Sequence, residues 1–358
     1  MTEPDLASAP APDLASAPAP TAPQPTTPAV PSPRPAIPLV RTRALLPAAF
    51  DLIARSNEDM RRASFYVGAV TLGTVGPLAL GLWALVVADR SFADPDAIAA
   101  SAVGGPLVML GLVATLGFIV AAIESRTLAT AVLGARMAGR PIGLRHAVAR
   151  ARARFWSAVG ASFIVGIILA VCQTAAEALV GPLLGQASEA SLIVSTVVTA
   201  VVGAPFAYVL SGVVLGDVAA LESIRRSVTV ARARWSAAAI IVTFETIAIL
   251  LIVFGLSAGG DLLLRLFGAL GIGPDSGPAG LALATIAIVA AVFALGTLLY
   301  TVTALTVAPQ VVMFVGLTHA TVGLDRIPRG ASRWFSGPML LGVLVAGVSL
   351  IALVNALG

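Results

Sequence analysis

Seven long apolar stretches constrain this chain more than any other feature of its sequence. A helix needs about 20 apolar residues, each rising about 1.5 Å, to cross the hydrocarbon core of a bilayer. Stretches of this kind lie at residues 64–88, 102–123, 156–178, 191–215, 235–257, 279–306 and 336–357. The sequence therefore predicts an all-α fold, a polytopic transmembrane helical bundle with seven spans and additional amphipathic helices at the interface.

The composition agrees with a bilayer as the main solvent. Of the 358 residues, 58% are hydrophobic and 11% are charged, whereas soluble domains carry about 25% charged residues. The net charge of +4 comes from arginine, since the chain has no lysine. Because these arginines border the apolar stretches, we expect membrane phospholipids, and not nucleic acid, as their partners.

The chain divides into a tail, residues 1–40, and a transmembrane helical domain, residues 41–358. In the tail the octapeptide PDLASAPA occurs twice in tandem, and prolines continue to Pro38. Pro and Ala at this density do not build a packed core, so we expect a disordered tail that serves as a spacer or docks a partner.

The end of the sixth span is less well defined than the others. Apolar character runs from Ala279 to Leu317, about twice the length of one crossing. Proline lacks the backbone N–H, so we predict that this span ends before Pro309 and that residues 310–320 lie at the interface. One long helix that tilts or protrudes is the alternative.

The arginines predict the orientation of the chain. All but two of the 22 lie before the first span or between spans two and three, four and five, or six and seven. Only Arg90 and Arg265 fall in the opposite loops. Because cytoplasmic loops carry an excess of basic residues, we predict a multi-pass protein of the bacterial plasma membrane with a cytoplasmic N-terminus and an external C-terminus.

Two basic segments stand directly before apolar spans, RARARFW at 150–156 and ARARW at 231–235. Amphipathic segments that precede spans lie in the plane of the interface, with aromatic residues at headgroup level. The predicted apolar faces are Leu144, Ala147, Val148, Ala151 and Phe155 in one segment and Leu221, Ile224, Val228, Ala231 and Trp235 in the other. Residues 43–62 predict a similar helix with Leu46, Phe50 and Ile53 on its apolar face.

These segments supply the predicted lipid contacts. The arginines either bind anionic lipid, each contributing about 1 kcal/mol near an anionic surface, or only anchor the topology. The predicted lipid-contacting set is Arg145, Arg150, Arg152, Arg154, Arg225, Arg226, Arg232 and Arg234. The predicted aromatic anchors are Phe155, Trp156, Trp235 and, from a weaker third copy ASRWFSG, Trp334. The recurrence also predicts three parallel hairpins, each running inward across the membrane, through a basic cytoplasmic segment, and outward again.

Three of the quoted segments together resemble a known family. LLPAAFDLIARS, GRPIGLRHAVARARARFW and ALESIRRSVTVARARW resemble the membrane-domain family named after glycerophosphoryl diester phosphodiesterase, over roughly residues 42–335. The resemblance implies a bundle with an amphipathic opening helix and basic cytoplasmic links. Some members carry a separate catalytic barrel that hydrolyses phosphodiesters with a metal. That chemistry needs histidines and clustered carboxylates, and His146 and His319 are the only histidines in this sequence.

Glu245 is the one carboxylate predicted in the middle of a span. A charge at this depth costs a few kcal/mol, so we expect Glu245 to face the bundle interior. Its role is either structural, bonded to a neighbouring helix or a threonine, or linked to a proton or substrate. The four glycines of span one, Gly68, Gly73, Gly76 and Gly81, predict close helix packing, and Pro205 predicts a kink in span four.

The sequence shows no catalytic constellation, no metal-ligand cluster and no cofactor motif, so we expect none of these. Our first functional hypothesis is a non-enzymatic integral membrane protein that contacts anionic lipid and acts as a scaffold or modulator of a membrane-protein partner. The alternative is a transporter or channel for a small solute or ion that uses Glu245. A membrane-embedded lipid enzyme is the third hypothesis and rests on the family name alone.

Overall fold

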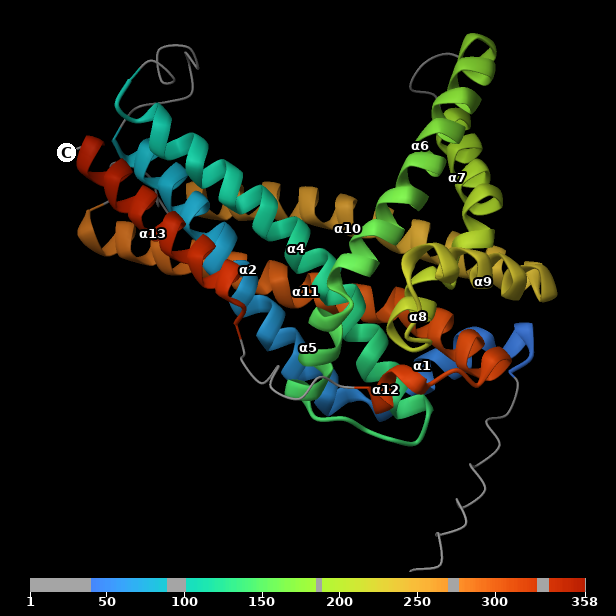
Figure 1. Cartoon of the computed structure of the whole chain (residues 1–358). Coiled ribbons are helices and arrows are strands. Elements are labelled where there is room, and N and C mark those ends of the chain that lie inside the picture. The colour runs from blue at the N-terminus through green and yellow to red at the C-terminus, as the bar shows by residue number, and fades with distance from the viewer. Residues whose placement is uncertain (1–39, 89–100, 185–188, 270–276, 327–334, 358) are drawn as a thin grey trace, which may run out of the picture. The chain divides into compact units, whose positions relative to one another are not determined.

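The structure is a computed structural model that describes residues 40–88, 101–184, 189–269, 277–326 and 335–357 (Figure 1). All regular elements in these ranges are helices. Seven of the described helices are long and apolar enough to cross a membrane. The prediction of an all-α helical bundle is confirmed, and the chain is a multi-pass membrane protein. The predicted tail lies outside the described residues apart from Val40.

Six of the predicted spans correspond to single helices, and all but the last extend beyond the predicted bounds at one or both ends. At residues 127–135 and 307–316 the additional turns are buried by the rest of the protein. They are α2 (Asn57–Val87), α4 (Gly104–Met137), α6 (Phe155–Leu184), α10 (Trp235–Ala269), α11 (Pro278–Thr318) and α13 (Gly337–Leu357).

Span four is interrupted at Pro205, where the sequence predicts a kink. It consists of α7 (Glu189–Gly203), the short 3-10 helix η2 (Ala204–Phe206) and α8 (Val209–Val214). The backbone groups freed at the break are bonded by serines of α9 (Ala220–Ala233). Ser227 Oγ donates to Pro205 O at 2.7 Å and accepts from Tyr208 N at 3.1 Å. These bonds keep the interrupted backbone paired inside the bundle.

The predicted break at Pro309 is wrong, and the long-helix alternative holds. α11 continues through Pro309 to Thr318, so its 41 residues span about 60 Å, twice a bilayer core. Residues 306–316 are all buried, and α11 packs against α1, α2 and α4. This packing outweighs the roughly 3 kcal/mol that a proline costs inside a helix.

Glycines bring the central helices into close contact. α2, α4, α11 and α13 run side by side (Figure 1) and pack on one another. A Cβ placed on Gly68 of α2 would lie 2.9 Å from Phe293 and Thr297 of α11, and one on Gly81 would lie 2.9 Å from Leu353 of α13. The prediction of close packing is confirmed for these two glycines, whereas a Cβ on Gly76 would meet only Leu72 of its own helix.

A left-handed residue ends an even-numbered span before each basic connection. Gly139 has a φ of 69°, Asp217 of 58° and His319 of 49°, and these are the positive φ values among the described residues. Each is followed by a short helix: α5 (Leu144–Ala153), α9 and α12 (Val322–Asp325). The shared order of span, left-handed residue, short helix and span supports the predicted three-hairpin repeat.

The opening amphipathic segment differs from the prediction in two ways. It divides at the buried Ser56 into α1 (Leu45–Arg55) and the start of α2, after a single 3-10 turn, η1 (Thr42–Ala44). Its buried face is Leu45, Ala49 and Leu52, and α1 packs against α11. Phe50, predicted on the apolar face that lies on the membrane surface, is 52% exposed. The helix is therefore oriented by contact with α11 and not by its most apolar side.

Candidate functional site

Asp217, in the connection between spans four and five, binds arginines from the connections between spans two and three and between spans six and seven. Its carboxylate accepts hydrogen bonds from Arg150 Nη2 at 2.6 Å, Arg154 Nε at 2.8 Å and Arg326 Nη1 at 3.0 Å. We call Arg150, Arg154, Asp217 and Arg326 the Asp217 cluster. Arg150 also donates to Val214 O, the last residue of α8, from Nε at 2.9 Å and Nη2 at 2.7 Å. The cluster thus joins all three basic connections and caps a helix end.

The predicted lipid contact of Arg150 is wrong. Its side chain is 1% exposed, and Asp217 beside it is 4% exposed. Sequence reasoning missed Asp217 because it stands in a short connection with no periodic pattern. The only signal is that it follows Gly216 directly after a span, where a left-handed turn residue is favoured.

Protonation of Asp217 is expected to lower the stability of the folded protein at acid pH. Burial raises the pKa of Asp217, but the hydrogen bonds from Arg150, Arg154 and Arg326 outweigh burial and lower the pKa from 3.8 to about 2. A carboxylate with a lowered folded pKa stabilises the fold above its unfolded pKa and loses this contribution as pH falls through the folded pKa. The Asp217 contribution should therefore be full above about pH 4 and vanish between about pH 4 and pH 2.

This expectation is checked by comparing thermal unfolding of the purified protein and of Asp217→Asn across that pH range. The difference in melting temperature between the two proteins should shrink steadily below about pH 4. A difference that stays constant down to pH 2 would contradict it. Other carboxylates titrate in both proteins, so the difference isolates Asp217.

Arg152 and Arg154 also bind carboxylates of the protein. Arg152 Nε lies 3.2 Å from Glu124 Oε1, and its Nη2 donates to Tyr66 Oη at 2.7 Å. Tyr66 Oη in turn donates to Glu124 at 2.9 Å. Glu124, which sequence reasoning missed because it adjoins the predicted end of span two, is buried. Lipid contact for Arg152 and Arg154 stays a prediction, although both guanidiniums already have anionic partners.

A basic groove lies where the start of α2 meets the start of α5. It encloses about 730 Å³ and is lined by Arg61, Arg62, Phe65, Tyr66, Gly143, Leu144, Arg145 and His146. Arg61 makes no ion pair with the described residues, and Arg62 pairs with the exposed Glu58 one turn away. The groove therefore combines three guanidiniums with two aromatic rings and offers donors to an anionic group.

The arginines of α9 lie on its exposed side. Arg225, Arg226 and Arg232 are exposed, and Arg226 pairs with Glu222 at 2.8 Å, while the half-buried Arg234 donates to Val40 O at 3.4 Å. The buried face of α9 is Ser223, Ser227 and Ala231. Of its predicted apolar face, only Ala231 is buried. Leu221 is exposed, so α9 presents apolar and basic side chains together, as interfacial helices do.

The predicted aromatic anchors are placed as follows. Trp156 is 80% exposed and Trp235 is 42% exposed, each at the start of a spanning helix. Phe155 is half-buried and contacts Trp156 edge to face, with ring centroids 5.4 Å apart. Trp334 lies outside the described residues. Exposed tryptophans at helix ends are typical of a membrane interface.

Glu245 faces the bundle interior and binds two side chains that sequence reasoning did not assign to it. It forms an ion pair with Arg126 of α4 and accepts a hydrogen bond from Gln310 Nε2 of α11 at 2.9 Å. The sequence interpretation placed Arg126 in a connection, and this is corrected, because α4 continues to Met137. The three side chains come from three helices far apart in sequence, a grouping that no local pattern encodes.

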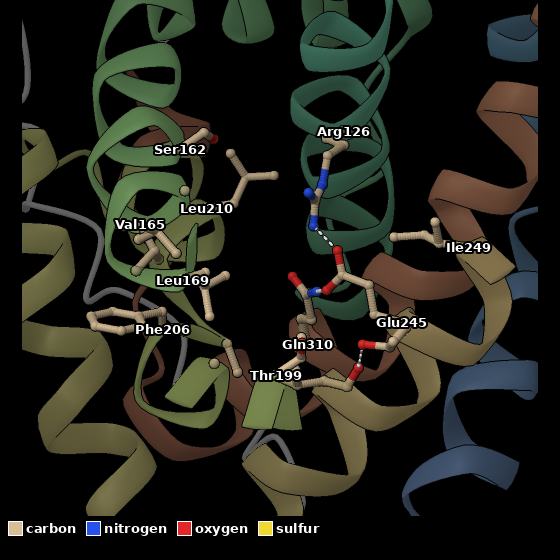
Figure 2. Close-up of a pocket in the computed structure, with 16 residues that line it drawn as sticks. Arg126, Ser162, Val165, Leu169, Thr199, Phe206, Leu210, Glu245, Ile249 and Gln310 are labelled. Atoms are coloured by element: carbon tan, nitrogen blue, oxygen red, sulfur yellow. Dashed lines mark hydrogen bonds and ion pairs between the residues drawn. The ribbon is translucent and has the colours of Figure 1, made fainter. Parts of the chain in front are cut away.

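The Arg126–Glu245 pair forms one wall of a cavity of about 320 Å³ (Figure 2). Figure 2 shows Arg126 and Gln310 directed at Glu245 from different helices, with Leu169 and Leu210 opposite. The other polar lining residues are Ser162, Thr199 and Thr246. The apolar lining includes Val165, Leu169, Phe206, Leu210 and Ile249. The cavity is thus polar on one side and apolar on the other.

The described part of the chain holds no group of three or more His, Cys, Asp or Glu residues placed to bind a metal ion. No family model, no curated protein and no solved structure matches this chain. The resemblance to the membrane-domain family named after glycerophosphoryl diester phosphodiesterase therefore stays a prediction.

Proposed function

We propose that this protein is a non-enzymatic, multi-pass membrane protein that binds anionic phospholipid at its basic end and acts as a scaffold or modulator of a membrane-protein partner. The basic end comprises α1, the start of α2, α5, α9 and the connection that contains α12. The proposal places it on the cytoplasmic side of a bacterial plasma membrane, with the C-terminus outside. Support for this side comes from the excess of arginine in the connections, which is typical of cytoplasmic loops.

The observation that carries the proposal is the basic groove between α2 and α5. Three arginines and a histidine line it together with Phe65 and Tyr66, and Arg61 makes no ion pair with the described residues. An anionic headgroup fits this lining, since guanidiniums form charge-assisted bonds to phosphate oxygens. The exposed arginines and Leu221 of α9 extend the same character along the interface.

Replacing Arg61, Arg62 and Arg145 together by glutamine is expected to weaken binding of anionic lipid about a hundredfold, at about 1 kcal/mol for each arginine. The measurement is a titration of the delipidated protein in mild detergent with short-chain phosphatidylglycerol. The matched control replaces Arg41, Arg43 and Arg55 by glutamine. These three arginines are exposed and lie outside the groove, so the control removes the same charge from the same end of the protein. Equal losses in both triple variants would contradict a specific groove.

A second candidate function is transport of a small solute or ion through the cavity at Glu245. The half-exposed Arg126 beside Glu245 favours it, because the cavity brings opposite charges to the depth of the spans. Flux into proteoliposomes that is lost in Glu245→Gln would support transport. No flux across a broad panel of ions and metabolites would count against it.

A further inference from the structure

The cavity at Glu245 is separate from the basic groove and has one polar and one apolar wall. Its polar wall is Arg126, Glu245 and Gln310, from α4, α10 and α11. Its apolar wall comes from α6 and from residues near η2, with Leu169 and Phe206 among them (Figure 2). Such a cavity suits a molecule that is charged at one end and apolar at the other.

The polar wall has unused hydrogen-bonding capacity of both kinds. A guanidinium has five N–H donors and a carboxylate has about four acceptor sites. Among the described residues, the Arg126 guanidinium bonds only to Glu245, and the Glu245 carboxylate accepts only from Arg126 and Gln310. A ligand can therefore add to both groups without breaking the pair. The matching ligand carries an anion for Arg126 and, a few ångströms away, a cation with N–H donors for Glu245.

The depth of the cavity favours a lipid as its occupant. Glu245 lies ten residues after Trp235, so it is about 15 Å along α10 and inside the candidate span Trp235–Ile252. Ile249, which lines the cavity, is 48% exposed, and the nearby Phe163 of α6 is 67% exposed. Both residues belong to candidate spans, so these exposed side chains meet acyl chains where the spans cross a bilayer.

We propose that this cavity binds a zwitterionic phospholipid with a primary ammonium, of the phosphatidylethanolamine class. The phosphate accepts hydrogen bonds from Arg126, and the ammonium donates to Glu245. The first part of one acyl chain lies against Leu169, Phe206 and Ile249. A phosphatidylcholine headgroup carries the same charges but lacks N–H donors, so it satisfies Arg126 and not Glu245.

The first test compares headgroups on the full-length protein. Delipidated protein in mild detergent is titrated with short-chain phosphatidylethanolamine and phosphatidylcholine, and bound lipid is counted by native mass spectrometry. Phosphatidylethanolamine should bind about tenfold more tightly, the value of one charge-assisted hydrogen bond of about 1.4 kcal/mol. Glu245→Gln should abolish this preference. Equal binding of the two lipids by the unmodified protein would overturn the proposal.

A second variant tests the cavity while leaving the ion pair intact. A Cβ at Gly166, which lines the cavity, would meet nothing within 4 Å, so Gly166→Leu fills open space without a backbone clash. The matched control is Gly111→Leu on α4, where a Cβ also meets nothing within 4 Å and which does not line the cavity. Gly166→Leu should lower the affinity for phosphatidylethanolamine at least about tenfold, and Gly111→Leu should leave this affinity unchanged. Unchanged binding in Gly166→Leu would overturn the proposal.

Two further experiments distinguish this lipid from a soluble ligand and from the anionic lipid of the basic groove. Free phosphoethanolamine should not compete with the lipid at equal concentration, because it lacks the chains that fill the apolar wall. Competition at equal concentration would identify a soluble zwitterion as the ligand and overturn the lipid assignment. The triple variant of Arg61, Arg62 and Arg145 should keep its preference for phosphatidylethanolamine while losing phosphatidylglycerol, so the two proposals fail independently.

Discussion

Asp217→Asn is expected to destabilise the protein by about 3 to 5 kcal/mol, because it removes the only carboxylate of the Asp217 cluster and leaves the buried Arg150 without its counter-charge. The asparagine side chain has the same size as aspartate, so the lost stability is due to the removed charge and not to a cavity. Arg154 and Arg326 would lose the same partner. Thermal unfolding in detergent, followed by size-exclusion of the folded fraction, measures the effect.

The matched control for this variant is Asp325→Asn. Asp325 pairs with Arg140 at 2.6 Å, but its side chain is 51% exposed. Exposed ion pairs contribute about 0 to 1 kcal/mol, so Asp325→Asn should shift the melting temperature little. If both variants lose the same stability, the Asp217 cluster is no more than a surface ion pair and its assigned role is wrong.

Gly296→Val is expected to destabilise the bundle by at least about 3 kcal/mol, beyond the usual range for overpacking of a core. A Cβ at Gly296 would lie 2.6 Å from Thr71 Oγ1 and 2.8 Å from Gly68 Cα. The second contact is with backbone, so rotation of a side chain cannot relieve it, and α11 has to move away from α2. Close backbone approach at small residues is what holds helices together in lipid.

The matched control is Gly111→Val on α4, because a Cβ there meets nothing within 4 Å. Both substitutions add the same side chain to a spanning helix, so their difference in melting temperature isolates the clash. We expect Gly111→Val to unfold close to the unmodified protein. A Gly296→Val protein as stable as Gly111→Val would show that α2 and α11 do not pack through these glycines.

The helices could be predicted from the sequence because long apolar stretches are a local property. A kink at Pro205 could also be predicted, yet the prediction that the helix ends before Pro309 is wrong. The two prolines differ in their surroundings, since residues 306–316 are buried within α11. Tertiary contact decides whether a proline ends a helix, and a single stretch of sequence does not contain that information.

The candidate sites were less predictable than the helices. Glu245 stands out because a carboxylate interrupts an apolar span, but its partners Arg126 and Gln310 come from helices elsewhere in the chain. The sequence predicts the arginines of residues 145–154 as one lipid-facing set because they flank the apolar face of an amphipathic segment. The fold separates them, and it buries Arg150 on Asp217 while leaving Arg145 exposed. Which side of a short helix faces protein depends on the neighbours it meets.

The Asp217 cluster also has a consequence for the order in which the chain is made. Arg150 and Asp217 leave the ribosome well before Gly323 and Arg326, yet Gly323 N donates to Leu215 O at 2.7 Å and α12 packs directly over the Arg150 guanidinium. In nascent chains that end before α12, we therefore expect the Arg150 guanidinium to be exposed to water. The last hairpin would then act as the closing step of biogenesis.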